Sequence, residues 1–287
     1  MKKANKFLLI GGDNRQIYIA DHLEKYGKSV SVYAGPEYKR ECIKNLKSEI
    51  AGYDAVVFPL PVTKDNKHLF SVSMIKETLD EIISYLSENQ FVFAGMAGKG
   101  FESKIKNKGI KLFDYFKRED ITIMNTVPTV QGIIKIILEN IDYTIHSCKC
   151  AIFGYGRISK VAADALSSLG SDVTVCVRKM SDIALADTNG IKGCFICDFY
   201  KYANDFDILI NTVPSTVIDR RILENVRKDC LIIDVASAPF GTDFAAAYDL
   251  GIKAMQCSSL PGKVAPKTAG KIIADGIINI LKEEGYE

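Results

Sequence analysis

Residues 150–179 constrain the fold of this chain more than any other stretch. An apolar run, Cys150–Phe153, stops at a short glycine turn, and apolar residues then recur at helical spacing as far as Gly170. A second apolar run follows at 173–177. Strand, glycine turn, helix and strand in this order predict one unit of a parallel sheet, with a helix N-terminus that can receive an anion.

The glycine turn is typical of a dinucleotide-binding site. It reads G-x-G-x-x-S, and Ser159 in the third position still permits close packing of helix against strand. The pattern alone is weak, but strand and helix flank it in the required order. The alternative is a glycine-rich structural turn. On the first interpretation the cofactor-binding residues of the turn are Gly154, Tyr155, Gly156, Arg157 and Ile158.

The end of the second strand predicts which nucleotide is bound. NAD sites usually place Asp or Glu about 20 residues beyond the glycines, to bind the ribose 2′-hydroxyl. This chain has Arg178 and Lys179 there instead. A guanidinium can hold a 2′-phosphate bidentately, whereas a carboxylate would repel it. We therefore expect NADP in preference to NAD, the alternative being two solvated surface cations.

Composition limits the remaining classes. The chain has 287 residues, enough for two modest domains, and its formal net charge of +2 gives no indication of a nucleic-acid-binding tail. The apolar run near the N-terminus indicates a strand rather than a signal peptide, and no run of about 18 apolar residues indicates a membrane span. Eight cysteines without a secretory signal predict reduced thiols in a cytoplasm. Cys194 and Cys197 have C-x-x-C spacing but no second pair nearby, so we expect neither a metal site nor a redox role.

The two halves of the chain repeat one pattern of strands. The first half opens with a strand at 7–10, a polar turn at 11–16, a helix and a strand at 29–33. Three later runs of the first half correspond to runs of the second, and the pairs are 53–59 with 206–214, 91–94 with 231–234, and 109–112 with 251–254. Short patterns of this kind can also converge. We predict an α/β fold of two Rossmann-like open parallel-sheet domains.

Two apolar helical patterns would join these domains. One covers 129–140, with Thr129 as its N-cap after Pro128, and the other begins at Thr268. We expect residues 1–128, with a returning helix at 268–287, to form a substrate domain. Residues 129–267, including the linking helix, would form the NADP-binding domain. The active site would then lie in a cleft between the domains, at the carboxyl ends of the strands.

Polar loops after the predicted strands supply candidate residues. In the first loop, Arg15 is expected to bind a substrate carboxylate, with an ion pair as the alternative, and Asp13 is either a helix cap or a catalytic group. Thr129 in the second loop could bind an anion or simply cap its helix. The third loop, 211–215, would pass beside the nicotinamide. Its expected cofactor contacts are Asn211, Thr212, Val213 and Pro214, with Ser215 on the substrate.

Two further loops complete the expected site. The loop at 234–243 would close over the nicotinamide, with Ala236 in contact with the cofactor. The loop at 258–268 is stiffened by prolines, and Lys263 or Lys267 could hold a carboxylate. Lys267 could also move a proton if desolvation lowers its pKa, although solvated lysines are the common case. The positions of the three histidines argue against a histidine base, and no metal-ligand constellation is visible.

With these residues in place, the chain resembles, almost from end to end, the A-subunit of dipicolinate synthase. The glycine turn is shared with many dehydrogenases, so longer motifs carry the resemblance. They are Pro128-Thr-Val-x-Gly132, Asp142-Tyr-Thr-Ile-His146, Asn211-Thr-x-Pro214-Ser215, Gly241-Thr-Asp-Phe244 and Leu260-Pro-Gly-x-Val-Ala-Pro-Lys-Thr-Ala-Gly270. The chain departs from the expected pattern at Cys257-Ser258-Ser259 and at Ala238, where an arginine is expected.

The resemblance implies oxidation of a dihydrodipicolinate-type intermediate of the lysine pathway to dipicolinate, with NADP+ as acceptor. It also implies, as partner, the smaller and flavoprotein-like B-subunit of dipicolinate synthase. A homo-oligomer and a place in the mother-cell cytoplasm of a sporulating bacterium are implied too, without nucleic-acid or membrane partners. Arg15 and Lys267 would hold the two carboxylates of this small substrate, and Lys267 or Asp13 would take the proton. Two alternatives stay open: a shikimate-dehydrogenase-like NADP oxidoreductase, indicated by the loop at 211–214, and a non-catalytic nucleotide-binding subunit.

Overall fold

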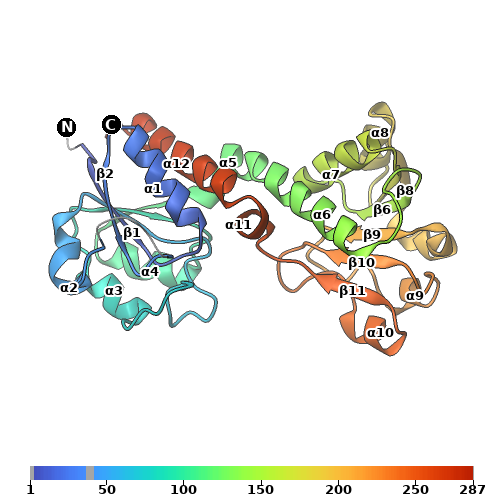
Figure 1. The fold of residues 1–287 in the computed structure, drawn as a ribbon, viewed down its shortest axis with the longest axis horizontal. Helices are drawn as coiled ribbons and strands as arrows, with labels where there is room; N and C mark the ends of the chain where they lie inside the picture. The colour runs from blue at the N-terminus through green and yellow to red at the C-terminus, as the bar shows by residue number, and fades with distance from the viewer. Residues whose placement is uncertain (1–2, 37–41, 287) are drawn as a thin grey trace. The chain divides into compact units, whose positions relative to one another are not determined.

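The protein is described by a computed structural model over residues 3–36 and 42–286, and it divides into two compact units. Unit 1 comprises Met1–Asn125 and Ala265–Glu287, and unit 2 comprises Thr126–Val264. Each unit holds one parallel sheet with helices on both faces (Figure 1). The predicted α/β class with two Rossmann-like parallel sheets is confirmed. The junctions between the units fall at 125/126 and 264/265, so Lys267 belongs to unit 1 rather than to the nucleotide-binding part.

Unit 1 contains a five-stranded sheet in the order β2-β1-β3-β4-β5. Its strands are β1 (Lys6–Ile10), β2 (Ser29–Tyr33), β3 (Ala55–Val57), β4 (Phe91–Ala94) and β5 (Lys111–Asp114). Its helices are α1 (Arg15–Lys25), α2 (Leu46–Glu49), α3 (Leu79–Tyr85), α4 (Lys99–Asn107), α5 (Glu119–Met124) and α12 (Pro266–Glu283). Phe7 and Leu9 of β1 pack with residues of α1 and α12, while Leu8 and Ile10 pack with residues of α2, α3 and α4. The strand is apolar at successive positions because helices cover both faces of the sheet.

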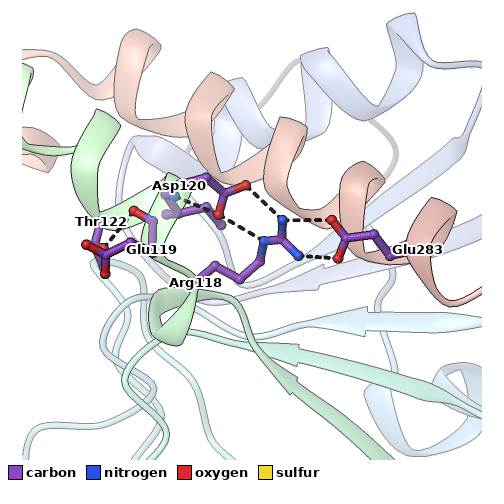
Figure 2. A network of polar contacts seen from close by, with 6 residues as sticks. Arg118, Glu119, Asp120, Thr122 and Glu283 are labelled. Atoms are coloured by element: carbon purple, nitrogen blue, oxygen red, sulfur yellow. Dashed lines mark hydrogen bonds and ion pairs between the residues drawn. The ribbon is translucent and has the colours of Figure 1, made fainter.

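The returning helix α12 is held to unit 1 by packing and by ion pairs. Gly270 allows the close approach to α1, because a Cβ atom there would lie 2.6 Å from the carbonyl oxygen of Arg15. At the other end of α12, the Arg118 guanidinium bridges the carboxylates of Glu283 and Asp120 with four hydrogen bonds of 2.6–3.0 Å (Figure 2). The hydrogen bonds from Arg118, together with its charge, lower the pKa of both carboxyl groups below their usual range.

Unit 2 contains a six-stranded sheet in the order β11-β10-β9-β6-β7-β8. Its strands are β6 (Lys149–Phe153), β7 (Asp172–Val177), β8 (Lys192–Phe195), β9 (Ile208–Asn211), β10 (Leu231–Asp234) and β11 (Lys253–Gln256). Its helices are α6 (Thr126–Asn140), α7 (Arg157–Ser168), α8 (Met180–Thr188), α9 (Arg220–Leu223), α10 (Phe244–Asp249) and α11 (Leu260–Val264). Cys150 and Ile152 face α6 and α7, whereas Ala151 and Phe153 face α9 and α10.

The two sheets share one strand order. Strands β7, β6, β9, β10 and β11 follow one another as β2, β1, β3, β4 and β5 do, which agrees with the repeat seen in the sequence. Unit 2 adds β8 at the edge beside β7. This edge strand was not predicted, because its four residues include a glycine and lack a continuous apolar run.

Two local expectations are wrong. Helix α6 begins at Thr126, so Thr129 is a buried residue within the first turn of the helix rather than its N-cap. Anion binding by Thr129 stays a prediction. Pro128 is tolerated because it lies in the first turn, where its missing N–H has no intrahelical partner. The expected loop at 258–268 is largely helical, since it forms α11 and then α12 with Pro266 in its first turn.

Within the described part of the chain, one helical stretch is apolar enough to be compared with a membrane span. Glu119–Asn140 has a mean hydropathy of 1.5 over its most apolar window, of which 44% is buried. By length and composition it could cross a bilayer, although Asn125, Gln131 and Lys135 interrupt its apolar residues. Helices packed in a protein core pass the same test, so this is weak evidence for a span.

Candidate functional site

The two glycines of the turn after β6 differ in the space beside them, which is filled by protein atoms at Gly154 and empty at Gly156. Gly154 has a φ of +95°, and a Cβ atom there would lie 2.8 Å from Thr212 Oγ1 and 2.9 Å from Val213 Cγ2. At Gly156, by contrast, a Cβ atom would meet nothing within 4 Å. Gly154 is therefore required by the packing of the turn against the residues after β9. Gly156 leaves room for a ligand to approach the backbone at the start of α7.

The third small residue of the fingerprint ties the turn to the next strand. Ser159 is fully buried, and its Oγ lies 2.8 Å from Thr212 Oγ1, which donates to the carbonyl oxygen of Phe153 at 2.9 Å. Since the single Thr212 hydroxyl proton goes to Phe153, Ser159 is the donor to Thr212. A glycine in place of Ser159 would lack this connection. The serine thus fixes the geometry of the turn as well as allowing close packing.

A cavity of about 400 Å³ opens over this turn. It lies where the carboxyl ends of β6, β7 and β9 meet, which is where open parallel sheets bind ligands. The lining residues are Gly154, Tyr155, Gly156, Val177, Arg178, Lys179, Asp182, Ile196, Thr212, Val213 and Pro214. The turn, the two cations after β7 and the segment after β9 were each expected at a nucleotide site, and unit 2 brings them together.

The charge of this cavity comes from three side chains. Arg178 and Lys179 are exposed, and among residues 3–36 and 42–286 neither side chain has a hydrogen-bond or ion-pair partner. Asp182, in the first turn of α8, brings one carboxylate to the same lining. The cavity therefore carries a net positive charge and can attract phosphate groups. Asp182 was not predicted, although its position three residues after Lys179, at a helix start, was visible in the sequence.

The loop after β9 is held from within. Asn211 is fully buried, and its side-chain amide donates to the Val213 carbonyl oxygen and accepts from the Val213 N–H, both at 3.0 Å. Asn211 was expected to touch the cofactor, but its polar atoms instead shape the loop that presents Thr212, Val213 and Pro214. The structure thus gives the Asn211 side chain a positioning role in the loop, and its expected contact with the cofactor stays a prediction.

The loop after β10 is also anchored internally. The buried Asp234 carboxylate accepts the N–H of Ala236 at 3.0 Å and that of Gly241 at 2.9 Å. Ala236 is 5% exposed and does not line the cavity. Ser215 lies just beyond the lining residue Pro214 and is exposed, whereas Lys263 is exposed on α11. These residues do not line the 400 Å³ cavity of unit 2, as Arg178 and Lys179 do.

In unit 1 the corresponding turn is covered by the chain itself. The N–H of Gly12 donates to the Phe70 carbonyl oxygen at 2.8 Å, and the N–H of Val72 donates to the Gly12 carbonyl oxygen at 3.0 Å. A Cβ atom on Gly11 would lie 2.9 Å from both Leu69 and Phe70. The segment 69–72 thus occupies the space above the turn, which leaves no room there for a pyrophosphate.

Arg15 and Asp13 form an ion pair within unit 1. Nε and Nη2 of Arg15 each contact one carboxylate oxygen of Asp13 at 2.8 Å, and Nη2 also donates to the Leu60 carbonyl oxygen. The Arg15 side chain is only 6% exposed. Asp13 additionally accepts the backbone N–H of Arg15 at 3.0 Å. Of the two interpretations drawn from the sequence, the structure places Arg15 in an ion pair rather than at an open anion site.

Tyr115 lines the same small cavity as this ion pair. Its hydroxyl donates to the Phe58 carbonyl oxygen at 3.1 Å, and full burial raises the pKa of the phenol above its usual range. The cavity that remains beside Asp13, Arg15 and Tyr115 measures only about 10 Å³. Asp13 and Arg15 therefore belong to the interior of unit 1.

A wider groove of about 800 Å³ lies along α1 and α12 of unit 1. Its lining residues are Tyr18, Asp21, His22, Glu24, Lys25, Lys267, Thr268 and Lys271. His22 and Lys271 both pair with Asp275, at 3.2 and 2.6 Å. Lys267 is exposed, and within the described ranges its side chain has no hydrogen-bond or ion-pair partner. No group of three or more metal-ligating side chains occurs among the described residues.

Comparison with known proteins gives consistent relatives along the whole chain. The sequence model of the N-terminal domain of the dipicolinate synthase A-subunit matches residues 6–116. The A-subunit of dipicolinate synthase from Bacillus subtilis (strain 168) is 30% identical over 285 residues, which cover 97% of this chain and 96% of the relative. The crystal structure of the same A-subunit from Bacillus halodurans is 29% identical with a TM-score of 0.89, and covers 98% of this chain and 99% of its own. A transhydrogenase from Sinorhizobium meliloti, 14% identical with a TM-score of 0.70, covers 96% of this chain and 92% of its own and shares the fold alone.

Proposed function

The chain belongs to the family of dipicolinate synthase A-subunits, and from this premise we propose that it oxidises a dihydrodipicolinate-type intermediate of the lysine pathway to dipicolinate, with NADP+ as acceptor. Membership of this family favours the proposal over a shikimate-dehydrogenase-like activity. The proposed oxidation also fits the two-domain fold that the chain shares with a transhydrogenase. The remaining alternative is a nucleotide-binding subunit that has no activity without a partner.

One observation carries the cofactor proposal. The open turn at Gly156, the N-terminus of α7 and the cations Arg178 and Lys179 line one cavity in unit 2. The first-turn N–H groups of α7 would bind the pyrophosphate, with Arg157 and Ile158 at the helix start. Arg178 and Lys179 would bind the 2′-phosphate of the adenosine ribose. The residues present thus fit NADP, while Asp182 is the single lining group of opposite charge.

The nicotinamide end would lie against the loop after β9. Asn211 holds this loop from behind, so that Thr212, Val213 and Pro214 present a fixed surface to the cavity. The bound cofactor supplies a hydride acceptor, and aromatisation of the substrate ring favours hydride loss. The protein then has to hold the ring in place and accept a proton.

We propose Lys267 as the residue that meets the substrate. It lies in the groove of unit 1 without a partner among the described residues, whereas the other candidate, Asp13, is committed to Arg15. Lys267 would hold a carboxylate or accept the proton. In a Lys267→Ala variant we expect turnover to fall about 100-fold with NADP+ affinity unchanged. Lys25→Ala, in the same groove, is the matched control, and unchanged turnover in Lys267→Ala would remove Lys267 from this role.

Titration calorimetry of the purified chain with NADP+ and NAD+, each with and without dipicolinate, tests the cofactor proposal. We expect NADP+ to bind more tightly than NAD+ and dipicolinate to strengthen its binding. Arg178→Ala should weaken NADP+ binding about 10- to 100-fold, because a charge-assisted contact is lost. Arg220→Ala, an arginine of unit 2 outside the cavity lining, should bind NADP+ as the unmodified chain does. A preference for NAD+ would contradict the role given to Arg178.

Activity of the isolated chain separates the enzyme from the non-catalytic alternative. The family name specifies one subunit of a synthase, so we further propose as partner a smaller, flavoprotein-like B-subunit. We also propose a homo-oligomer and action in the mother-cell cytoplasm during sporulation. NADPH formation by the chain alone would place the hydride transfer in this chain, whereas NADPH formation only after addition of the B-subunit would support the non-catalytic alternative. Light scattering of the chain, alone and mixed with its proposed partner, would measure both assemblies.

A further inference from the structure

Two cysteine sulfur atoms lie in contact beside the nucleotide cavity. Cys176 of β7 and Cys194 of β8 are partners in the strand register, and their Sγ atoms are 3.6 Å apart. Neither thiol has a part in the proposed chemistry. The C-x-x-C spacing pointed to Cys197 as the neighbour of Cys194, whereas the fold supplies Cys176, which no sequence spacing indicates.

The environments of these two thiols differ. Cys176 is fully buried with Phe153 and Phe199, whereas Cys194 is half-buried. Burial raises the pKa of the Cys176 thiol, and the hydrogen bond between the two thiols lowers the pKa of Cys194. Cys194 therefore forms the thiolate more readily and is also the thiol that solvent reaches. Thiolate character and access are the two properties that select a cysteine for oxidation.

We propose that Cys194 is a site of oxidation by peroxides, that Cys176 resolves the oxidised form as a disulfide, and that this bond reshapes the nucleotide cavity. In the first step the Cys194 thiolate attacks one oxygen of hydrogen peroxide, breaks the O–O bond and becomes a sulfenic acid, and the displaced hydroxide takes up a proton as water. In the second step the Cys176 sulfur attacks the Cys194 sulfur, and the sulfenic hydroxyl leaves with the Cys176 proton as water. Two thiols lose two electrons, and one peroxide is reduced to two waters.

The position of β8 lets this bond form and links it to the cavity. The two sulfurs must approach from 3.6 Å to about 2.05 Å. β8 is a four-residue edge strand whose described strand partner is β7, so no second strand has to separate when it moves. Ile196 follows Cys194 by two residues, Arg178 follows Cys176 by two, and both line the cavity. A shift of β8 therefore changes the wall that faces the bound nucleotide, a consequence that rests on the proposed function.

Peptide mapping tests the disulfide without reference to nucleotide binding. The full chain is reduced, treated with stoichiometric hydrogen peroxide, alkylated and digested with trypsin without reductant. Cys176 then lies in the peptide 161–178, and Cys194 and Cys197 lie together in 193–201. The proposal predicts a cross-link between these two peptides and the loss of two of the eight thiols. A bond between Cys194 and Cys197 would instead stay within one peptide and would overturn the proposal, as would the absence of any disulfide.

Three variants assign the bond and test its effect. The cross-link should persist in Cys197→Ser and disappear in Cys176→Ala and Cys194→Ser. Oxidation should weaken NADP+ binding about tenfold in the unmodified chain and in Cys197→Ser, and reductant should restore it, whereas Cys176→Ala should not respond. A cross-linked chain with unchanged NADP+ affinity would overturn the link to the cavity. A reduced chain that binds neither nucleotide but still cross-links would overturn the proposed function and leave the oxidation site standing.

Discussion

The two units have the same strand order, but the turns after their first strands differ. In unit 2 the turn at 154–156 opens on a cavity of about 400 Å³. In unit 1 the turn at 11–14 is covered by residues 69–72, and the cavity lined by Asp13 and Arg15 measures about 10 Å³. Topology alone therefore does not make a nucleotide site. The side chains placed on the shared topology decide which turn stays open.

The residue two positions before the first residue of each helix differs between the two turns. Both helices begin with an arginine, Arg15 in α1 and Arg157 in α7. Two residues before Arg15 stands Asp13, which binds the guanidinium and draws it into the interior. Two residues before Arg157 stands Tyr155, which supplies no charge, and Arg157 is exposed. An aspartate at this position turns a potential anion-binding arginine into a structural one.

The largest effect should come from breaking the ion pair of unit 1. Arg15→Ala leaves the largely buried Asp13 carboxylate and the Leu60 carbonyl oxygen without their donor. We expect the free energy of unfolding to fall by about 3 kcal/mol, because removing one partner of a buried pair strands the other charge. Circular dichroism during urea denaturation would measure this, with Lys25→Ala as the exposed control on α1. NADP+ affinity should not change. Unaltered stability with loss of dipicolinate binding would restore the substrate role predicted from the sequence.

Two glycine substitutions should separate packing from binding in unit 2. Gly154→Ala places a Cβ atom against Thr212 and Val213 at a φ of +95°, so we expect a loss of about 2 kcal/mol in stability together with loss of NADP+ binding. In Gly156→Ala the new Cβ atom meets no protein atom within 4 Å, so the free energy of unfolding should stay within about 0.5 kcal/mol of that of the unmodified chain. The methyl group would obstruct the pyrophosphate and weaken NADP+ binding about tenfold. Urea denaturation and calorimetry on both variants provide the measurements. Unchanged NADP+ affinity in Gly156→Ala would argue against a nucleotide at this turn.

Most of the fold could be predicted because each buried strand leaves a local pattern of apolar residues in the sequence. Strands buried on both faces are apolar at successive positions, and this pattern marked β1, β3, β4, β6, β9 and β10. The outer strands β2, β5 and β11 also contain polar residues and are only partly buried. β8 lacks that pattern because it is a short edge strand. The start of α6 was misplaced because Pro128 is compatible with the first turn of a helix as well as with the residue before it.

The site could be predicted only where it is local in sequence. The glycine turn and the cations at 178–179 lie within one strand–helix–strand unit, so their spacing was sufficient. The burial of Arg15 depends on Leu60 and on the segment 69–72, which are distant in the sequence. The inward amide of Asn211 and the contact of Cys176 with Cys194 likewise depend on packing between elements. Such contacts have no signature in residue spacing.

Acid should weaken unit 1 more than unit 2 through the Arg118 network. The pKa of Asp120 and that of Glu283 are both lowered in the folded chain by Arg118. Their stabilising contribution is complete above the unfolded-state values of about 3.9 and 4.3, and is lost as the pH falls through the lower folded-state values. Between pH 5 and pH 3 we expect the Tm of the unmodified chain to fall by a few degrees more than the Tm of the Arg118→Gln variant. Hydrogen exchange should show earlier opening of α12 than of α7, and equal opening of both helices would contradict this assignment.

The smallest effect should come from Asp182, and it bears most directly on the choice of nucleotide. This carboxylate lines the same cavity as Arg178 and Lys179 and would repel a 2′-phosphate there. In Asp182→Asn we expect NADP+ to bind about threefold more tightly, a gain that should shrink at high ionic strength because the charges are near solvent. NAD+ affinity should stay unchanged, and calorimetry of both nucleotides at two salt concentrations would measure the difference. If the substitution instead weakened NAD+ and left NADP+ unaffected, Asp182 would be the acceptor of the ribose hydroxyls, and the open turn of unit 2 would be an NAD site.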